Sequence, residues 1–259
     1  MATRDDWEEH WKRYAAAASR NPAQRMRHAA VAARLRRGLD EAKACILDLG
    51  SGQGDLVELL RRTLPKAQFL GVELSASGVA LSRRKVPDAV FLSADLFHPS
   101  EDLRGYAGWA TDAVCSEVLE HVDSPGAFLE AARPWLADGA RLIVTVPGGP
   151  ISAFDREIGH RRHFTRASIA EALEEAGFEV ERVDRAGFPF FNLYRLVVLA
   201  RGRRLAADVA AENTGFSSRL AAAVMAIFRG LFHLNLPDSP FGWQMIAIAR
   251  KVERVLPEA

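Results

Sequence analysis

The ten residues from Ile46 to Asp55 read I-L-D-L-G-S-G-Q-G-D, and they decide the fold of this 259-residue chain. A short apolar run that contains one acid leads into glycines at alternate positions, Gly50, Gly52 and Gly54. The apolar periodicity that follows is typical of a helix. The stretch therefore predicts a buried strand, a tight glycine turn and the start of a helix, a geometry that brings bare backbone against a ligand.

The acids around this turn indicate which kind of ligand it binds. Glu73 ends the next strand-like run, at a distance from the glycines that suits a ribose-binding carboxylate. In a dinucleotide fingerprint the third glycine begins the helix, but here Asp55 stands at that position. A carboxylate there would repel a phosphate and compete with it for the same amide donors. Because S-adenosylmethionine carries a sulfonium and an α-ammonium group but no phosphate, Asp48 and Asp55 favour it over NAD.

Strand-like and helix-like segments alternate along the chain from residue 44 to residue 184. The strand-like runs are rich in Val, Ile and Leu, as expected for strands that helices cover on both faces. This alternation predicts an α/β fold with a doubly wound, mostly parallel sheet. The predicted strands are 44–49, 68–73, 89–93, 110–116, 140–147, 178–184 and 243–250, and the predicted helices between them are 54–62, 76–85, 124–136 and 165–176.

The chain divides into three parts. Residues 1–40 are predicted to form N-terminal helices that are broken at Asn21-Pro22, and residues 41–184 and 243–259 form the core. Residues 185–242 are an insertion before the last strand, with helical stretches near 190–210 and 216–234. The second stretch is apolar on nearly every side, so we expect it to be buried. We interpret the insertion as a substrate cap or a homodimer surface, with an interfacial membrane helix as the third alternative.

Five segments together resemble the class I S-adenosylmethionine-dependent methyltransferases. D-L-G-S-G-Q-G at 48–54 is similar to motif I of that family, and four later segments follow in the family's order. The resemblance covers roughly residues 40 to 185, resumes at the C-terminus, and is greatest to the small-molecule branch that includes ubiquinone-pathway methyltransferases. It implies a seven-stranded sheet. The four later segments are G-V-E-L at 71–74, S-A-D-L at 93–96, D-A-V-C-S-E-V-L-E-H-V at 112–122 and R-L-I-V-T-V-P at 141–147.

The resemblance also implies where S-adenosylmethionine, and its product S-adenosylhomocysteine, would bind. Asp48 and the glycine turn would hold the methionine end of the cofactor, Glu73 the ribose hydroxyls, and Asp95 the adenine amino group. Leu74 would lie against the adenine, and the backbone near Ser116 would line the space under the sulfonium. The predicted cofactor-binding residues are Asp48, Gly50, Ser51, Gly52, Glu73, Leu74, Asp95, Leu96, Ser116 and Glu117. In this family N-terminal helices often cover the nucleoside pocket, so Trp7, Trp11 and Tyr14 would close a lid or else pack against the sheet.

Two histidines are candidate catalytic residues. His121 follows the fourth predicted strand and His160 lies in the loop after the fifth, so both border the predicted acceptor pocket. Three interpretations stay open. Either histidine acts as a general base, or Glu117, Glu120 and His121 bind a divalent metal together with a distal histidine, or both histidines only stabilise their turns. The metal interpretation follows from relatives among the ubiquinone-pathway O-methyltransferases and small-RNA 2′-O-methyltransferases.

Composition excludes several other classes of function. The net charge is +1, with 34 basic and 33 acidic residues, so no overall basic field favours nucleic acid. The longest uninterrupted apolar stretch, 220–228, is too short to cross a bilayer, so we expect no transmembrane segment. Two cysteines in predicted buried strands and no signal peptide indicate a cytoplasmic protein.

These observations predict an enzyme that methylates an oxygen or nitrogen of a small, partly apolar molecule. The alternatives are an RNA or protein methyltransferase, and a non-catalytic protein that binds S-adenosylmethionine as a partner of another chain.

Overall fold

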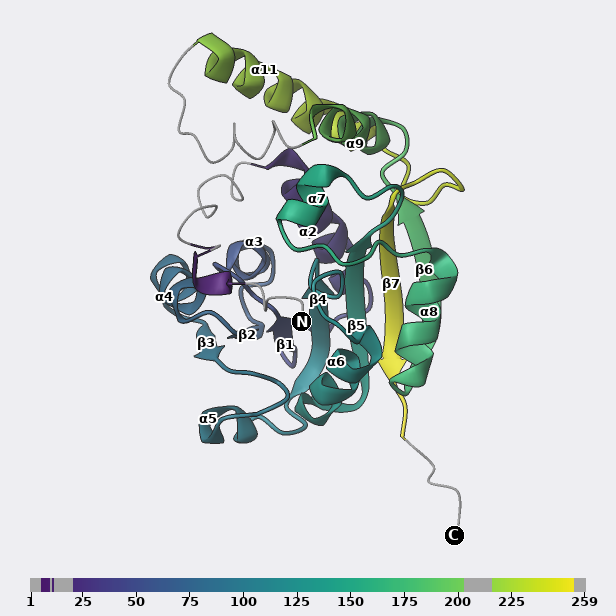
Figure 1. Cartoon of the computed structure of the whole chain (residues 1–259). Helices are drawn as coiled ribbons and strands as arrows, with labels where there is room; N and C mark the ends of the chain where they lie inside the picture. The colour runs from purple at the N-terminus through teal and green to yellow at the C-terminus, as the bar shows by residue number, and fades with distance from the viewer. Residues whose placement is uncertain (1–5, 10, 12–20, 203–215, 254–259) are drawn as a thin grey trace.

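One mixed sheet forms the centre of the molecule. The computed structural model describes residues 6–9, 11, 21–202 and 216–253, and for 216–222 it describes the backbone only. The strands lie in the order β3-β2-β1-β4-β5-β7-β6 (Figure 1). They are β1 (Cys45–Leu49), β2 (Gln68–Glu73), β3 (Val90–Ser93), β4 (Ala110–Ser116), β5 (Leu136–Pro147), β6 (Phe178–Ala186) and β7 (Gln244–Lys251).

The strand pairing confirms the predicted fold. β1 runs parallel to both β2 and β4, and Leu47 lies opposite Leu70 on one side and Ala113 on the other. β7 is antiparallel to both of its neighbours and lies between β5 and β6. The order of the strands reverses between β1 and β4, and open α/β sheets bind their ligands at the carboxyl ends of the strands at such a point.

Helices cover both faces of the sheet, so successive residues of a central strand enter different halves of the core. Ile46 packs under α2 (Pro22–Leu35), α3 (Asp55–Thr63) and α4 (Ala76–Lys85). Leu47 packs on the opposite face, under α5 (Glu101–Arg104), α6 (Pro125–Ala132) and α8 (Arg166–Glu175). This division explains why the strands read as continuous apolar runs.

The boundaries of the elements differ from the prediction mainly between α6 and β5. The predicted helix 124–136 ends at Ala132 and continues as a 3₁₀ turn, η1 (Arg133–Trp135), because proline at position 134 cannot continue an α-helix. β5 begins at Leu136, four residues before the predicted start. The Asp138-Gly139 pair lies within β5, where its pairing with β4 shifts register, and does not form a separate turn.

The insertion adds two helices beyond the carboxyl edge of the sheet (Figure 1). They are α9 (Phe190–Arg201) and α11 (Phe216–Leu231). A 3₁₀ turn, η2 (Phe232–Leu234), follows α11. The predicted helix 190–210 thus ends at Arg201, and its part beyond residue 202 lies outside the described residues. Phe191 of α9 and Phe228 of α11 pack with Ala23 at the start of α2.

Within this chain the second helix of the insertion is only partly buried, and burial of its remaining surface against a partner stays a prediction. One face of α11 packs on α2 and α9, where Phe228 is buried. Val224, one turn before Phe228 on the same side, still has 37% of its surface accessible, and Ile227, farther round the helix, has 61%. No helix in the described part of the chain is long and apolar enough to span a bilayer.

Candidate functional site

The glycine turn between β1 and α3 approaches its surroundings so closely that side chains would not fit. Gly50 and Gly52 have φ angles of +73° and +54°, in the left-handed region that favours glycine. A Cβ atom on Gly50 would lie 2.5 Å from Val118 Cγ2, and one on Gly52 would meet the indole of Trp11. The amides of Gly50 and Ser51 both donate to the carbonyl oxygen of Val72, which fixes the turn to β2.

Two adjoining cavities open at this turn. The first has a volume of about 360 Å³ and the second about 430 Å³. Both are lined by the residues that separate them, Trp7, Trp11, Gly50, Glu117 and His121. All ten predicted cofactor-binding residues line one or both cavities. The first cavity is lined by Asp48, Gly50, Ser51, Gly52, Ser116 and Glu117. The second is lined by Gly50, Glu73, Leu74, Asp95, Leu96 and Glu117. Their roles toward the cofactor stay predictions.

Two buried carboxyl groups lie under the turn. Glu73 accepts hydrogen bonds from the amides of Gly52 and Ser75, both at 2.9 Å, and burial raises its pKa. Burial and the neighbouring Glu73 raise the pKa of Asp48 to about 7. A cation bound beside these groups would favour their charged forms, so the pair suits a ligand with an ammonium or sulfonium group.

Asp55 does not contribute to ligand selection in the way that we predicted from the sequence. Its carboxylate forms an ion pair with Lys85 and also accepts hydrogen bonds from Gln24 at 3.1 Å and Gln53 at 2.8 Å. Since Lys85 neutralises much of its charge, Asp55 would repel a phosphate far less than a bare carboxylate. The electrostatic argument against a diphosphate therefore rests on Asp48 and Glu73.

The N-terminal segment covers the turn. Trp7 packs edge-on against His121, with ring centroids 4.8 Å apart, and Trp11 lies over Gly52 and beside Glu73. The carboxylate of Glu8 accepts hydrogen bonds from the first amides of α4, where the positive end of the helix dipole favours an acid. Trp7 and Trp11 thus line both cavities, and their role as a lid stays a prediction, whereas Tyr14 lies outside the described residues.

Glu117 is held in a strained conformation at the end of β4. Its φ angle of +57° is unusual for a residue with a side chain, and such outliers cluster at functional sites. Its Oε1 accepts hydrogen bonds from Gln244 Nε2 at 2.9 Å and Thr145 Oγ1 at 3.2 Å. Its Oε2 lies 3.5 Å from Nε of Arg27. These contacts tie α2, β5 and β7 to the tip of β4.

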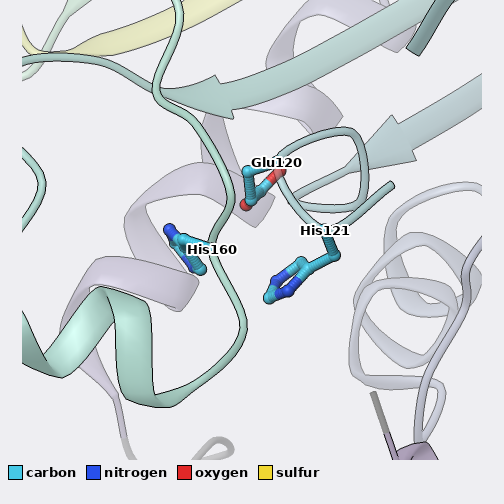
Figure 2. Close-up of side chains that lie close together, drawn as sticks. All are labelled: Glu120, His121 and His160. Carbon is cyan, nitrogen blue, oxygen red and sulfur yellow. The ribbon is translucent and has the colours of Figure 1, made fainter. Parts of the chain in front are cut away.

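Glu120, His121 and His160 point toward one another across the loops after β4 and β5 (Figure 2). One ligand atom of each lies within 4.8 Å of the others. The His121 and His160 rings meet edge to face with centroids 4.7 Å apart, and Arg161 N donates to Glu120 O at 2.8 Å. The two predicted catalytic histidines are therefore neighbours. Glu117, a predicted metal ligand, is bound elsewhere and is not part of this group.

A chain of hydrogen bonds determines which ring nitrogen of His160 carries the proton. Burial lowers the pKa of both His160 and His163, so both imidazoles are neutral near pH 7. His163 Nδ1 lies 3.0 Å from the carbonyl oxygen of Gly149 and must donate to it, which makes His163 Nε2 an acceptor. His160 Nδ1, at 3.3 Å from that Nε2, is then the donor. The lone pair of His160 is thus on Nε2, where it is available to a proton or a metal.

The carboxyl group of Glu120 is compensated only in part, by the charge of Arg27. The residue is fully buried, and among the described residues neither carboxyl oxygen has a hydrogen-bond partner. Burial and the neighbouring Glu117 raise its pKa well above 4.5. A buried carboxyl group in this state needs a proton or a cation. Together with two imidazole ligands, these orphaned oxygens fit a divalent cation of borderline character.

An ion pair fixes the loop that carries His160. Residues 153–157 form α7, and a capping box between Ser152 and Asp155 stabilises its N-terminus. Asp155 binds Arg195 of α9 with both carboxylate oxygens, at 2.9 and 2.6 Å, and both side chains are almost fully buried. This pair joins the 148–164 loop to the insertion along one wall of the first cavity.

Some residues of this site could not be predicted from their local sequence. Arg27, Gln244 and Arg195 lie on α2, β7 and α9, and no motif marks them. Their only sequence signal is a polar or charged residue within a largely apolar helix or strand. Phe191, Tyr194, Val198 and Met225 show that the insertion itself lines the first cavity.

Comparisons with known proteins agree with this geometry. A family model described as a methyltransferase domain matches residues 23–183. The trans-aconitate 2-methyltransferase of Afipia carboxidovorans is 28% identical over 163 residues, which cover 62% of this chain and 58% of that enzyme. The ubiquinone biosynthesis O-methyltransferase of Xanthomonas axonopodis pv. citri is 28% identical over 175 residues, or 61% of this chain and 72% of that enzyme. The chain thus matches little more than half of the first relative.

A solved structure has the same fold. Phosphoethanolamine N-methyltransferase 2 of Haemonchus contortus, in complex with phosphomonomethylethanolamine and S-adenosylhomocysteine, superposes with a TM-score of 0.57. It is 16% identical, and the match covers 86% of this chain and 52% of that one. The family match and the sheet order together confirm the family predicted from the glycine turn: the chain belongs to the methyltransferase-domain family, within the class I S-adenosylmethionine-dependent methyltransferases.

Proposed function

We propose that this protein transfers the methyl group of S-adenosylmethionine to an oxygen or nitrogen atom of a small, partly apolar acceptor. The observation that carries the proposal is the pair of adjoining cavities at the carboxyl edge of the sheet. The second cavity, with Glu73 and Asp95, would take the nucleoside, and the methionine end would extend past Gly50 into the first. The rest of the first cavity is walled by aromatic and apolar side chains, namely Trp7, Phe154, Phe191, Tyr194, Val198 and Trp243, which suit such an acceptor.

Methyl transfer from a sulfonium needs little chemistry from the protein beyond alignment and proton removal. The glycine turn and Asp48 would align the methyl group, and the strained Glu117 would keep the tip of β4 beneath the sulfonium. His121, which lines both cavities, would take the proton of the acceptor. Burial and the neighbouring His121 hold the pKa of His160 far below 6.5, so His160 is a weak base.

The competing proposal is that the same side chains bind a divalent cation. Glu120, His121 and His160 would hold it, and it would lower the pKa of an acceptor hydroxyl when bound. The absence of a hydrogen-bond partner, among the described residues, for either carboxyl oxygen of Glu120 supports this account, and the aromatic packing of His121 against Trp7 supports the general base.

The proposed function is tested with radiolabelled S-adenosylmethionine and three groups of acceptors. We expect label on small amphipathic phenols, hydroxy acids or amines, and none on bulk RNA or on protein. Label on RNA, with binding that weakens steeply as salt rises, would contradict the proposal in favour of a nucleic-acid enzyme. Tight cofactor binding without label on any acceptor would favour a non-catalytic partner.

The raised pKa of Asp48 predicts how cofactor affinity depends on pH. Below pH 7 the carboxyl group is mostly protonated, and it must lose that proton to face the α-ammonium group of the ligand. The dissociation constant for S-adenosylhomocysteine should therefore fall by about tenfold between pH 6 and pH 8. Calorimetry on the wild type and on Asp48→Asn measures this, and the variant should show a weaker affinity that changes little over the same range. A variant with the wild-type pH dependence would assign the titration to another group.

A further inference from the structure

The exposed apolar side chains of this molecule gather on the insertion. Among the described residues, eleven large apolar side chains are exposed, and eight of them lie between positions 193 and 241. Of the other three, Leu74 and Phe97 line the second cavity, which leaves Val90. The eight are Leu193, Leu196, Val197, Val224, Ile227, Leu234, Leu236 and Phe241. An accumulation of this kind marks an interaction surface.

The pattern along the two helices places these side chains on outer faces. Leu193, Leu196 and Val197 have the i, i+3, i+4 spacing of one helix face, and α9 buries Phe191 and Val198 on its other face. On α11 and η2, Ile227 and Leu234 are exposed, and Val224 is partly exposed at the edge of the side that buries Phe228 and Phe232. The 234–241 segment is tied to the start of α9, since Asn235 Oδ1 accepts from the Phe190 amide at 2.9 Å.

The charge of the insertion indicates what covers this surface. Residues 190–241 contain six arginines and three acids, a net charge of +3, and since Arg195 is buried in its ion pair with Asp155, +2 of this charge is left without it, against +1 for the whole chain. Neither α9 nor α11 contains an acid, and Arg201 and Arg229 are exposed. A twofold contact between copies would place this positive charge against itself. An anionic lipid surface complements it, and exposed apolar residues beside arginines are typical of helices that lie in the membrane interface.

We infer that the outer faces of α9 and α11, together with residues 234–241, dock this protein on an anionic membrane surface. The helices would lie in the plane of the interface, with Ile227 and Leu234 among the acyl chains and the arginines among the headgroups. The inner face of α9, with Phe191, Tyr194 and Val198, lines the first cavity. If the proposed function holds, α9 and α11, which contributes Met225 to the wall, separate the acceptor cavity from the lipid, so the acceptor is an amphiphile taken from the membrane.

Vesicle binding tests this inference without cofactor or acceptor, so its outcome is independent of the proposed methyl transfer. The full chain is sedimented with vesicles of phosphatidylcholine alone and of phosphatidylcholine with phosphatidylglycerol. We expect binding to the anionic vesicles, weaker binding at high salt, and at least tenfold weaker binding for Ile227→Asp and Leu234→Asp. The matched control, Val90→Asp, changes an exposed apolar residue on β3 and should bind as the wild type does.

Affinity for S-adenosylhomocysteine, measured for each variant, verifies that the fold is intact. If the wild-type protein does not sediment with the anionic vesicles, the inference is overturned. Equal vesicle binding by Ile227→Asp and the wild type would also overturn it. A dimer in solution that Ile227→Asp dissociates, with no vesicle binding, would assign the surface to a second copy of the chain and would also overturn it.

Discussion

Replacement of His121 by alanine is expected to lower kcat by about two to four orders of magnitude, the usual contribution of a general base. The dissociation constant for S-adenosylhomocysteine should change by less than about threefold, because the cofactor contacts that we predict come from the glycine turn, Glu73 and Asp95. Steady-state kinetics with the acceptor found by the labelling experiment, together with calorimetry, separates the two effects. His233→Ala is the matched control, since His233 is exposed and lines neither cavity. A loss of cofactor affinity with unchanged kcat would contradict the proposed role of His121.

A chelator decides between the general base and a metal ligand. If His121 acts as a base, activity survives treatment with EDTA, and Glu120→Gln retains most of the wild-type kcat. If Glu120, His121 and His160 hold a cation, EDTA abolishes activity, a divalent ion restores it, and Glu120→Gln binds Mn²⁺ more weakly in calorimetry than the wild type does. Because Mn²⁺ binding is measured directly, the metal account is tested even before an acceptor is known.

Replacement of Asp155 by alanine is expected to destabilise the protein by about 3–5 kcal/mol, the cost of leaving one partner of a buried ion pair alone. Only 11% of the Arg195 side chain is accessible, so water cannot replace the lost carboxylate. The change also frees the 148–164 loop from α9 and so should loosen the wall of the first cavity. Urea denaturation followed by tryptophan fluorescence measures the free energy of unfolding.

A second substitution and a pH series make this prediction specific. Arg195→Met in the Asp155→Ala background removes the unpaired guanidinium and should recover part of the lost stability. Burial alone would raise the pKa of Asp155, but the hydrogen bonds and charge of Arg195 hold it well below 3.8. The stabilisation is therefore present above pH 4 and is lost as the pH falls below about 4, a dependence that Asp155→Ala should lack. Equal stability of the two proteins at pH 7 would show that the pair does not support the fold.

The sequence predicts the fold almost completely because the deciding signals are local. The ranges 68–73, 76–85 and 110–116 match β2, α4 and β4 at both ends. Each has a strong apolar pattern or a capping residue, such as Ser75 before α4. The prediction is wrong where two local signals compete, as at Asp138-Gly139, which has the composition of a turn but lies within a paired strand.

The candidate site is predictable only as far as its residues follow strand ends. His121 and His160 lie side by side because β4 and β5 are parallel neighbours and their carboxyl ends meet. The partners of Glu117 come from α2, β5 and β7, and only the tertiary fold brings them together. The charge on Asp55 shows the same limit. Its pairing with Lys85, thirty residues away at the end of α4, is invisible in the motif.

The central claim is that the glycine turn, with Asp48 and Glu73 buried beneath it, holds a nucleoside that bears positive charge and no phosphate. Isothermal titration of the wild-type protein with S-adenosylhomocysteine and with NADH tests this claim most directly. We predict saturable binding of S-adenosylhomocysteine with a dissociation constant in the micromolar range, about −8 kcal/mol, and no measurable heat from NADH. Saturable binding of NADH without any response to S-adenosylhomocysteine would contradict it.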